Sequence, residues 1–155
     1  MPRWAKRMAT GTDSDGKSVV HLLHRAGQRA DELFLQTARG LSPRQFEVLK
    51  SVARADGLNQ TAIMAATGID RSSVSSLVAR MVRTGLLQRR RTRRDSRTYA
   101  VRLTSKGRQA LEAALPRARA ADKALLALLS PGQKASLLQA LERISLPGPR
   151  SAPKS

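Results

Sequence analysis

Cysteine is absent from this chain of 155 residues, and aromatic side chains make up only 3% of it. Without cysteine, the chain can form no disulfide, no thiolate metal site and no cysteine redox sensor. No apolar run approaches the length of a membrane span, and no apolar stretch follows the basic start, as a signal peptide would require. We therefore expect a cytoplasmic protein whose core is built from Leu, Val, Ile and Ala.

Acidic residues are also scarce, since 11 Asp and Glu stand against 29 Lys and Arg, for a formal net charge of +18. The positive charge is concentrated: eleven of the Lys and Arg lie between Arg80 and Arg108, where Asp95 is the one acid. A focused basic patch usually faces nucleic acid or an anionic membrane. The alternative is a general bias toward arginine that favours solubility.

Residues 59–104 carry the most informative pattern in the chain. Asn59 can cap a short helix that ends at Gly68, and Asp70 can cap a longer helix from Arg71 to Thr84. Two helices joined by a few residues containing glycine form a helix-turn-helix. Two strands are expected next, from residue 86 and over residues 99–104, with an arginine-rich tip between them. The pattern predicts a winged helix-turn-helix in a mainly helical chain.

The outer face of the second of these helices is small and hydroxylated. Its candidate DNA contacts are Arg71, Ser72, Ser73, Ser75, Ser76 and Arg80. Serine hydroxyls can bond to base edges in the major groove with little selectivity, whereas arginine is the commonest specific partner of guanine. In isolation these serines could equally be solvated helix surface, but the apolar stripe opposite them and the adjacent wing favour the DNA-binding role.

Four blocks of the sequence, in order and at this spacing, resemble the MarR family of bacterial transcriptional regulators. The blocks are LSPRQFEVL (41–49), GIDRSSVSSLVARMVRTGLLQRR (68–90), RDSR (94–97) and LTSKG (103–107). The resemblance covers about residues 18–144 and implies a homodimer in which the first and last helices of two chains interlock. Such a dimer would bury the apolar stripes of residues 19–34 and 111–144. The alternative is that these stripes pack on each other within one chain.

The resemblance also implies roles in the wing. Arg97 would enter the minor groove, held in position by Asp95, and an arginine there favours a narrow, A·T-rich groove. The other candidate wing contacts would meet mostly phosphates, and these are Arg90, Arg91, Arg93 and Arg94. The alternative for this arginine run is a solvated, self-repelling loop.

Members of that family commonly bind a small, often aromatic or phenolic anion between the dimer helices and the winged region, which usually releases the DNA. The candidate ligand residues are polar residues near that junction, namely His21, His24, Arg25, Arg44 and Gln45. The alternative is that the two histidines are surface or dimer-contact residues. As a metal pair they would lack a third ligand, so no metal site and no cofactor are expected.

These inferences divide the chain into five parts. They are a flexible N-terminus (1–16), an N-terminal dimerisation helix (17–40), a winged helix-turn-helix (41–104), C-terminal dimerisation helices (105–146) and a disordered tail (147–155). Pro116 predicts a kink within the C-terminal helices. The expected function is that of a dimeric transcription repressor released from a pseudo-palindromic site by a small anion. The alternative is a sequence-tolerant architectural DNA-binding protein without a ligand switch. No nucleophile–base pair or phosphate loop is evident, so an enzyme is not expected.

Overall fold

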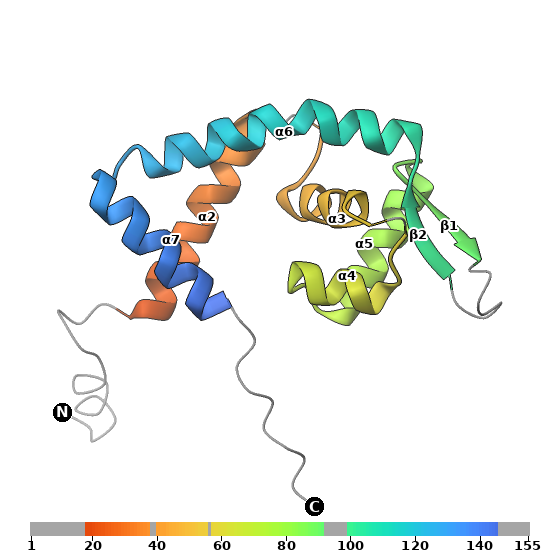
Figure 1. Cartoon of the computed structure of the whole chain (residues 1–155), viewed down its shortest axis with the longest axis horizontal. Coiled ribbons are helices and arrows are strands. Elements are labelled where there is room, and N and C mark those ends of the chain that lie inside the picture. Colours follow the sequence, from red (N-terminus) through yellow and green to blue (C-terminus); the bar gives the residue numbers. More distant parts are fainter. Residues whose placement is uncertain (1–17, 38–39, 56, 92–98, 146–155) are drawn as a thin grey trace, which may run out of the picture.

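The computed structural model describes residues 18–37, 40–55, 57–91 and 99–145, and it is mainly helical with one β-hairpin (Figure 1). In chain order the elements are α2 (Val19–Thr37), α3 (Pro43–Ala53), α4 (Gln60–Thr67), α5 (Arg71–Arg83), β1 (Leu87–Arg91), β2 (Tyr99–Leu103), α6 (Ser105–Leu126) and α7 (Pro131–Ser145). The long helix α6 joins two groups of elements, with α2 and α7 at one end and α3, α4, α5 and the hairpin at the other (Figure 1). The predicted fold class is confirmed.

Helices α3 and α7 begin at the same local motif, Ser-Pro-x-Gln. At α3, the Ser42 hydroxyl accepts from the Gln45 amide at 3.2 Å, and the Gln45 side chain accepts from the Ser42 amide at 2.9 Å. Ser130 and Gln133 make the same exchange at the start of α7, at 2.9 and 3.4 Å. These reciprocal bonds satisfy backbone donors that the first helical turn leaves without partners, so both helices start where the sequence predicts.

The helix-turn-helix is α4 followed by α5. The Asn59 side chain caps α4 by accepting from the Ala62 amide at 2.8 Å. Gly68 ends α4 in the left-handed conformation, with φ 69°, and its amide donates to the Met64 carbonyl at 2.8 Å. This turn brings Asp70 to the start of α5, so both predicted helices form with the predicted caps.

One apolar core holds α3, α4, α5 and the hairpin in a fixed arrangement. Its most deeply buried side chains come from every one of these elements, and they include Val48, Leu49, Ile63, Val74, Val78, Met81, Leu87 and Val101. The Phe46 ring of α3 packs on the Phe34 ring of α2, with centroids 5.3 Å apart, and thereby ties α2 to this core. The side chains of α5 that face the core are therefore unavailable to any partner.

Besides the pairing of its own two strands, the hairpin forms backbone bonds with Leu58, which the sequence did not predict. β1 and β2 pair antiparallel from Leu87↔Leu103 to Arg91↔Tyr99. Leu58, which precedes α4, pairs with Val101 through backbone bonds of 3.0 and 2.7 Å. A single residue pair has no periodicity that a sequence could show. The bridge attaches the base of the wing to the segment that leads into α4.

α6 starts in close contact with the end of α5. Thr104 caps α6 by accepting from the Gly107 amide at 3.0 Å, and a Cβ atom on Gly107 would lie only 2.0 Å from the Leu86 carbonyl oxygen. The backbones therefore approach so closely that only glycine fits at this position. Further along, α6 runs through Pro116 as one continuous helix. Within the described ranges, none of the helices is long and apolar enough to span a bilayer.

Candidate nucleic-acid interface

Helix α5 has one buried side and one exposed polar side. Its stripe of Val74, Leu77, Val78 and Met81 is buried in the core. On the opposite side, five of the six residues predicted to contact DNA are exposed, and Ser73 is half-buried; the exposed five are Arg71, Ser72, Ser75, Ser76 and Arg80. The fold thus presents these residues together on one helix face, as the amphipathic pattern predicts.

The start of α5 is stabilised by its own polar residues. The Asp70 carboxylate accepts from the Ser73 amide at 3.0 Å and from the Ser72 hydroxyl at 2.9 Å. Bonds from the Ser73 side chain and amide, and then from Ser72, lower the pKa of Asp70 from 3.8 to about 2, because they favour the charged carboxylate. In the free protein, the Ser72 hydroxyl therefore donates to Asp70.

The arginines of the wing begin on β1. Arg90 donates to the Gln88 side chain at 3.4 Å. The Arg91 guanidinium donates to the Tyr99 hydroxyl at 3.4 Å and lies 5.8 Å from the centre of its ring, so Tyr99 holds Arg91 against the hairpin. From the sequence, Tyr99 was expected only to begin the return strand. Its contact with Arg91 follows from the strand register, in which the two residues are paired.

The other predicted wing contacts fall between the two strands in the sequence. Residues 92–98 lie outside the described ranges. They include Arg93, Arg94, Asp95 and Arg97. The predicted roles of these four residues therefore stay predictions.

The five predicted ligand residues do not come together within one chain. His21, His24 and Arg25 are exposed on the first turns of α2, at the end of that helix away from α3 (Figure 1). Gln45 is engaged in the cap of α3. Arg44 instead lines a hollow with Ser73, Ser76, Leu77 and Arg80 of α5, so the structure places it beside the candidate DNA-binding face.

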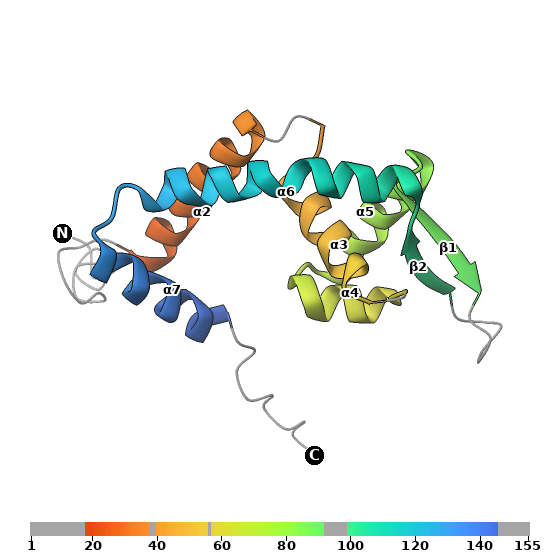
Figure 2. The same ribbon diagram turned by 45° about the horizontal axis from the view of Figure 1, so that its top comes forward.

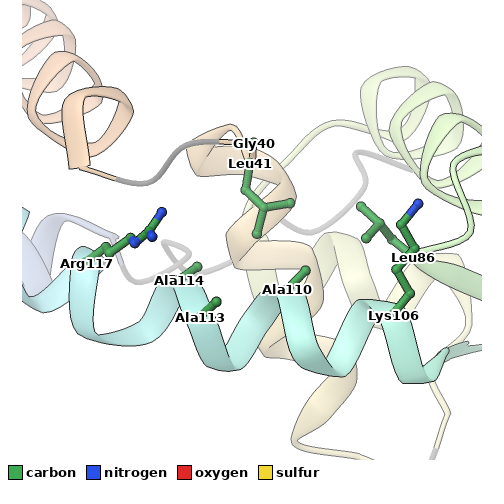
Figure 3. A pocket seen from close by; sticks show the side chains of 8 residues that line it. All are labelled: Gly40, Leu41, Leu86, Lys106, Ala110, Ala113, Ala114 and Arg117. Atoms are coloured by element: carbon green, nitrogen blue, oxygen red, sulfur yellow. The ribbon is translucent and has the colours of Figure 1, made fainter.

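A different cavity lies between α6 and the start of α3. It has a volume of about 240 Å³ and is lined by Gly40, Leu41, Leu86, Lys106, Ala110, Ala113, Ala114 and Arg117. Figure 3 shows Leu41 and the alanines between two cationic side chains, Lys106 and Arg117. The Lys106 ammonium also donates to the Thr84 carbonyl at the end of α5, at 2.8 Å. The sequence does not show this cavity, because its walls come from separate segments of the chain.

Comparisons with known proteins agree with this architecture. Residues 39–98 match the family model described as MarR family. The transcriptional regulator HosA of Escherichia coli O111:H- is 31% identical over 129 residues, which cover 79% of this chain and 95% of HosA. The chain belongs to the MarR family.

Solved structures of regulators show the same fold. CouR, a transcriptional repressor bound to a 23-mer DNA duplex, is 31% identical with a TM-score of 0.75, over 83% of this chain and 92% of CouR. BpsR of Bordetella bronchiseptica, whose DNA binding is regulated by 6-hydroxynicotinic acid, is 29% identical with a TM-score of 0.76, over 83% of this chain and 99% of BpsR. This MarR-family protein is a DNA-binding transcriptional regulator and not an enzyme.

Proposed function

We propose that this MarR-family protein is a dimeric repressor that releases a pseudo-palindromic operator when a small aromatic anion binds. The observation that carries the proposal is the exposed face of α5, where Ser75 and Ser76 lie between Arg71 and Arg80. We place this helix in the major groove, with the arginines bonding to bases or phosphates. Because its operator is DNA of the cell, the protein would act in the cytoplasm.

The wing completes the DNA contact in this proposal. Arg97 enters the minor groove with Asp95 holding it, and Arg93 and Arg94 meet phosphates, as the resemblance implies. Arg90 and Arg91 lie on the same hairpin, at the end of β1. Since serines discriminate weakly among bases, much of the affinity comes from these arginines and is steeply salt dependent.

Dimerisation is supported by the apolar side chains that one chain leaves exposed. None of the residues of α7 is buried, although Leu137, Leu138, Leu141 and Ile144 are spaced for one apolar stripe. On α2, Val19, Val20, Leu22 and Leu23 are exposed as well. Both helices lie at the end of α6 away from the helix-turn-helix (Figures 1 and 2). A second copy that covers them removes this surface from water and places two α5 helices about one DNA turn apart.

The ligand would occupy the cavity between α6 and the start of α3. Leucine and alanine side chains offer an apolar wall to an aromatic ring, while Lys106 and Arg117 offer cations to a carboxylate. An anion that draws Lys106 away from the Thr84 carbonyl would remove a positive charge from the C-terminal end of α5, where it is stabilising. The regulation of BpsR by 6-hydroxynicotinic acid supports a ligand of this class. His21, His24 and Arg25 could reach such a ligand only from the second copy.

The decisive experiment compares two DNA duplexes at physiological salt. A duplex is first selected from random sequence by the protein, and its Kd is then measured against a scrambled duplex of the same composition. We expect a ratio of about 10³ or more, as for specific regulators. A ratio near unity would instead support the architectural alternative. Sedimentation of the free protein should show a dimer.

The ligand switch has its own test. A panel of small aromatic carboxylates is titrated into the protein–operator complex, and release of DNA is followed by fluorescence anisotropy. We expect at least one compound to release the wild-type protein and Arg117→Ala to bind the operator normally but to resist release. If no compound in the panel changes the operator affinity, the ligand-responsive part of the proposal is wrong.

A further inference from the structure

The candidate DNA-binding surface extends from α5 onto the start of α3, at Arg44. A hollow of about 230 Å³ is lined by Arg44 together with Ser73, Ser76, Leu77 and Arg80. Arg44, Ser76 and Arg80 are exposed. Two arginines, one from each of two helices that are far apart in the sequence, therefore line the same hydroxylated hollow.

The two helices hold this hollow in a fixed shape. The backbone of Arg44 lies inside the first turn of α3, which the reciprocal bonds between Ser42 and Gln45 stabilise. Leu41 and Phe46, on either side, are anchored in the core. Leu77 of α5, which lines the same hollow, is only 6% exposed. The fold therefore sets the backbone positions from which Arg44 and Arg80 project, and only their side chains need to adjust when a ligand binds.

The chemistry of the hollow suits a phosphodiester. A guanidinium group can donate two parallel bonds to phosphate oxygens, and the Ser76 hydroxyl can donate to the same group. Its lining includes no acidic side chain. The hollow also opens on the exposed side of α5, where a DNA backbone would pass at the edge of the major groove.

We propose that this hollow binds one phosphate of the DNA backbone in each half-site, with Arg44 and Arg80 as its cations. This inference rests on the proposed placement of α5 in the major groove. Arg44 is accordingly a DNA-contact residue and not part of the effector site. The contact explains how a helix with a weakly selective serine face is held in register, since backbone contacts orient a protein on the duplex.

The matched test uses Arg44→Ala and Arg54→Ala. Each variant removes one positive charge from an end of α3, but Arg54 caps the far end of that helix, where it lines a different hollow together with residues of α6 such as Leu111 and Asp122. We expect Arg44→Ala to weaken binding about tenfold or more, by the same factor for the selected and scrambled duplexes. Its plot of log affinity against log salt should flatten by about 0.9 for each chain that contacts DNA. Arg54→Ala should keep the wild-type slope.

A second measurement identifies the phosphate itself. Single methylphosphonates, which are uncharged, are placed along each strand of the duplex. Several positions should weaken wild-type binding, because the wing arginines also contact phosphates. One position per half-site should weaken the wild type but have no further effect on Arg44→Ala. Arg44→Lys, which keeps the charge, should keep the salt slope while losing part of the affinity.

Three outcomes would overturn the assignment. Equal salt slopes for Arg44→Ala and Arg54→Ala would show a general charge effect. A loss confined to the selected duplex would show a base contact. Normal DNA affinity with lost ligand response would return Arg44 to an effector site. Binding to the scrambled duplex at low salt requires no operator specificity, so it tests the phosphate contact by itself. A failure of the phosphate assignment can therefore be told apart from a failure of the repressor proposal.

Discussion

Replacing Thr104 with valine should weaken the junction at which α6 starts against the end of α5. The Thr104 hydroxyl accepts from the Gly107 amide at 3.0 Å. It donates to the Gly85 carbonyl, and the Leu86 carbonyl lies 3.2 Å away. Valine has nearly the same shape, so it removes these bonds and changes little else. The residue is half-buried, so water replaces the lost partners only in part.

The expected loss follows from the two kinds of bond. Removing a helix cap costs about 1 kcal/mol. Leaving the partly buried Gly85 carbonyl without this donor costs about another 1 kcal/mol. The free energy of unfolding should therefore fall by about 2 kcal/mol. The bond from Lys106 to the Thr84 carbonyl involves no atom of Thr104, so we expect the junction to loosen without coming apart.

Urea unfolding followed by circular dichroism measures this change. Wild type, Thr104→Val and Thr104→Ser are compared at one protein concentration, because dimerisation makes the midpoint concentration dependent. Thr104→Ser keeps the hydroxyl and should stay within about 0.5 kcal/mol of wild type. The valine variant should unfold at lower urea with an unchanged m value. If both variants are equally stable, the hydroxyl bonds do not hold this junction.

Three further predictions concern the glycine contact, the cap of α5 and the wing. Gly107→Ala places a methyl carbon 2.0 Å from the Leu86 carbonyl oxygen, so it should cost about 3 kcal/mol. Gly132→Ala is the control, because no atom lies within 4 Å of its new carbon, and it should leave the thermal midpoint unchanged or raise it. Equal effects of the two glycine substitutions would contradict the close approach of Gly107 to the Leu86 carbonyl. The carboxyl of Asp70 should titrate near its pKa of about 2 by NMR. Because this pKa lies below the ordinary value of 3.8, the ionised carboxylate stabilises the folded protein fully above pH 3.8, and this stabilisation is lost as the pH falls toward 2. A titration midpoint near 3.8 would show that the cap is not formed. Arg97→Ala should lose most operator affinity in anisotropy titrations while the protein sediments as before, and unchanged affinity would remove Arg97 from the minor groove.

The helix starts were predictable because their causes are local. Asn59 and Asp70 each bond to an amide three residues later, and the Ser42 cap is equally local. The apolar periodicity of α5 likewise needs only a 13-residue segment to show which side is buried. The caps and the apolar periodicity together predicted that the serines and arginines of α5 would share one exposed face.

The contacts that the sequence could not show join residues distant in the chain. Lys106 donates to Thr84, 22 residues away, and the cavity beside it draws its walls from Gly40 to Arg117. Arg44 was assigned to a ligand site from its place in the chain alone. In the folded protein, the packing of α3 on the shared core brings it beside Ser76 and Arg80 instead.

By itself, the sequence determined the family, the order of the elements, the caps and the exposed basic and serine-rich surface. Each of these depends on residues that are close in the chain or on a pattern that repeats along it. Tertiary structure alone decided which cations share a hollow, which carbonyl holds Lys106 and where glycine permits two backbones to touch. These depend on how the helices cross, and close packing sets that geometry through the shapes of many buried side chains at once. The sequence therefore predicted the proposed DNA-binding face of α5, whereas the position of Arg44 beside that face was visible only in the folded chain.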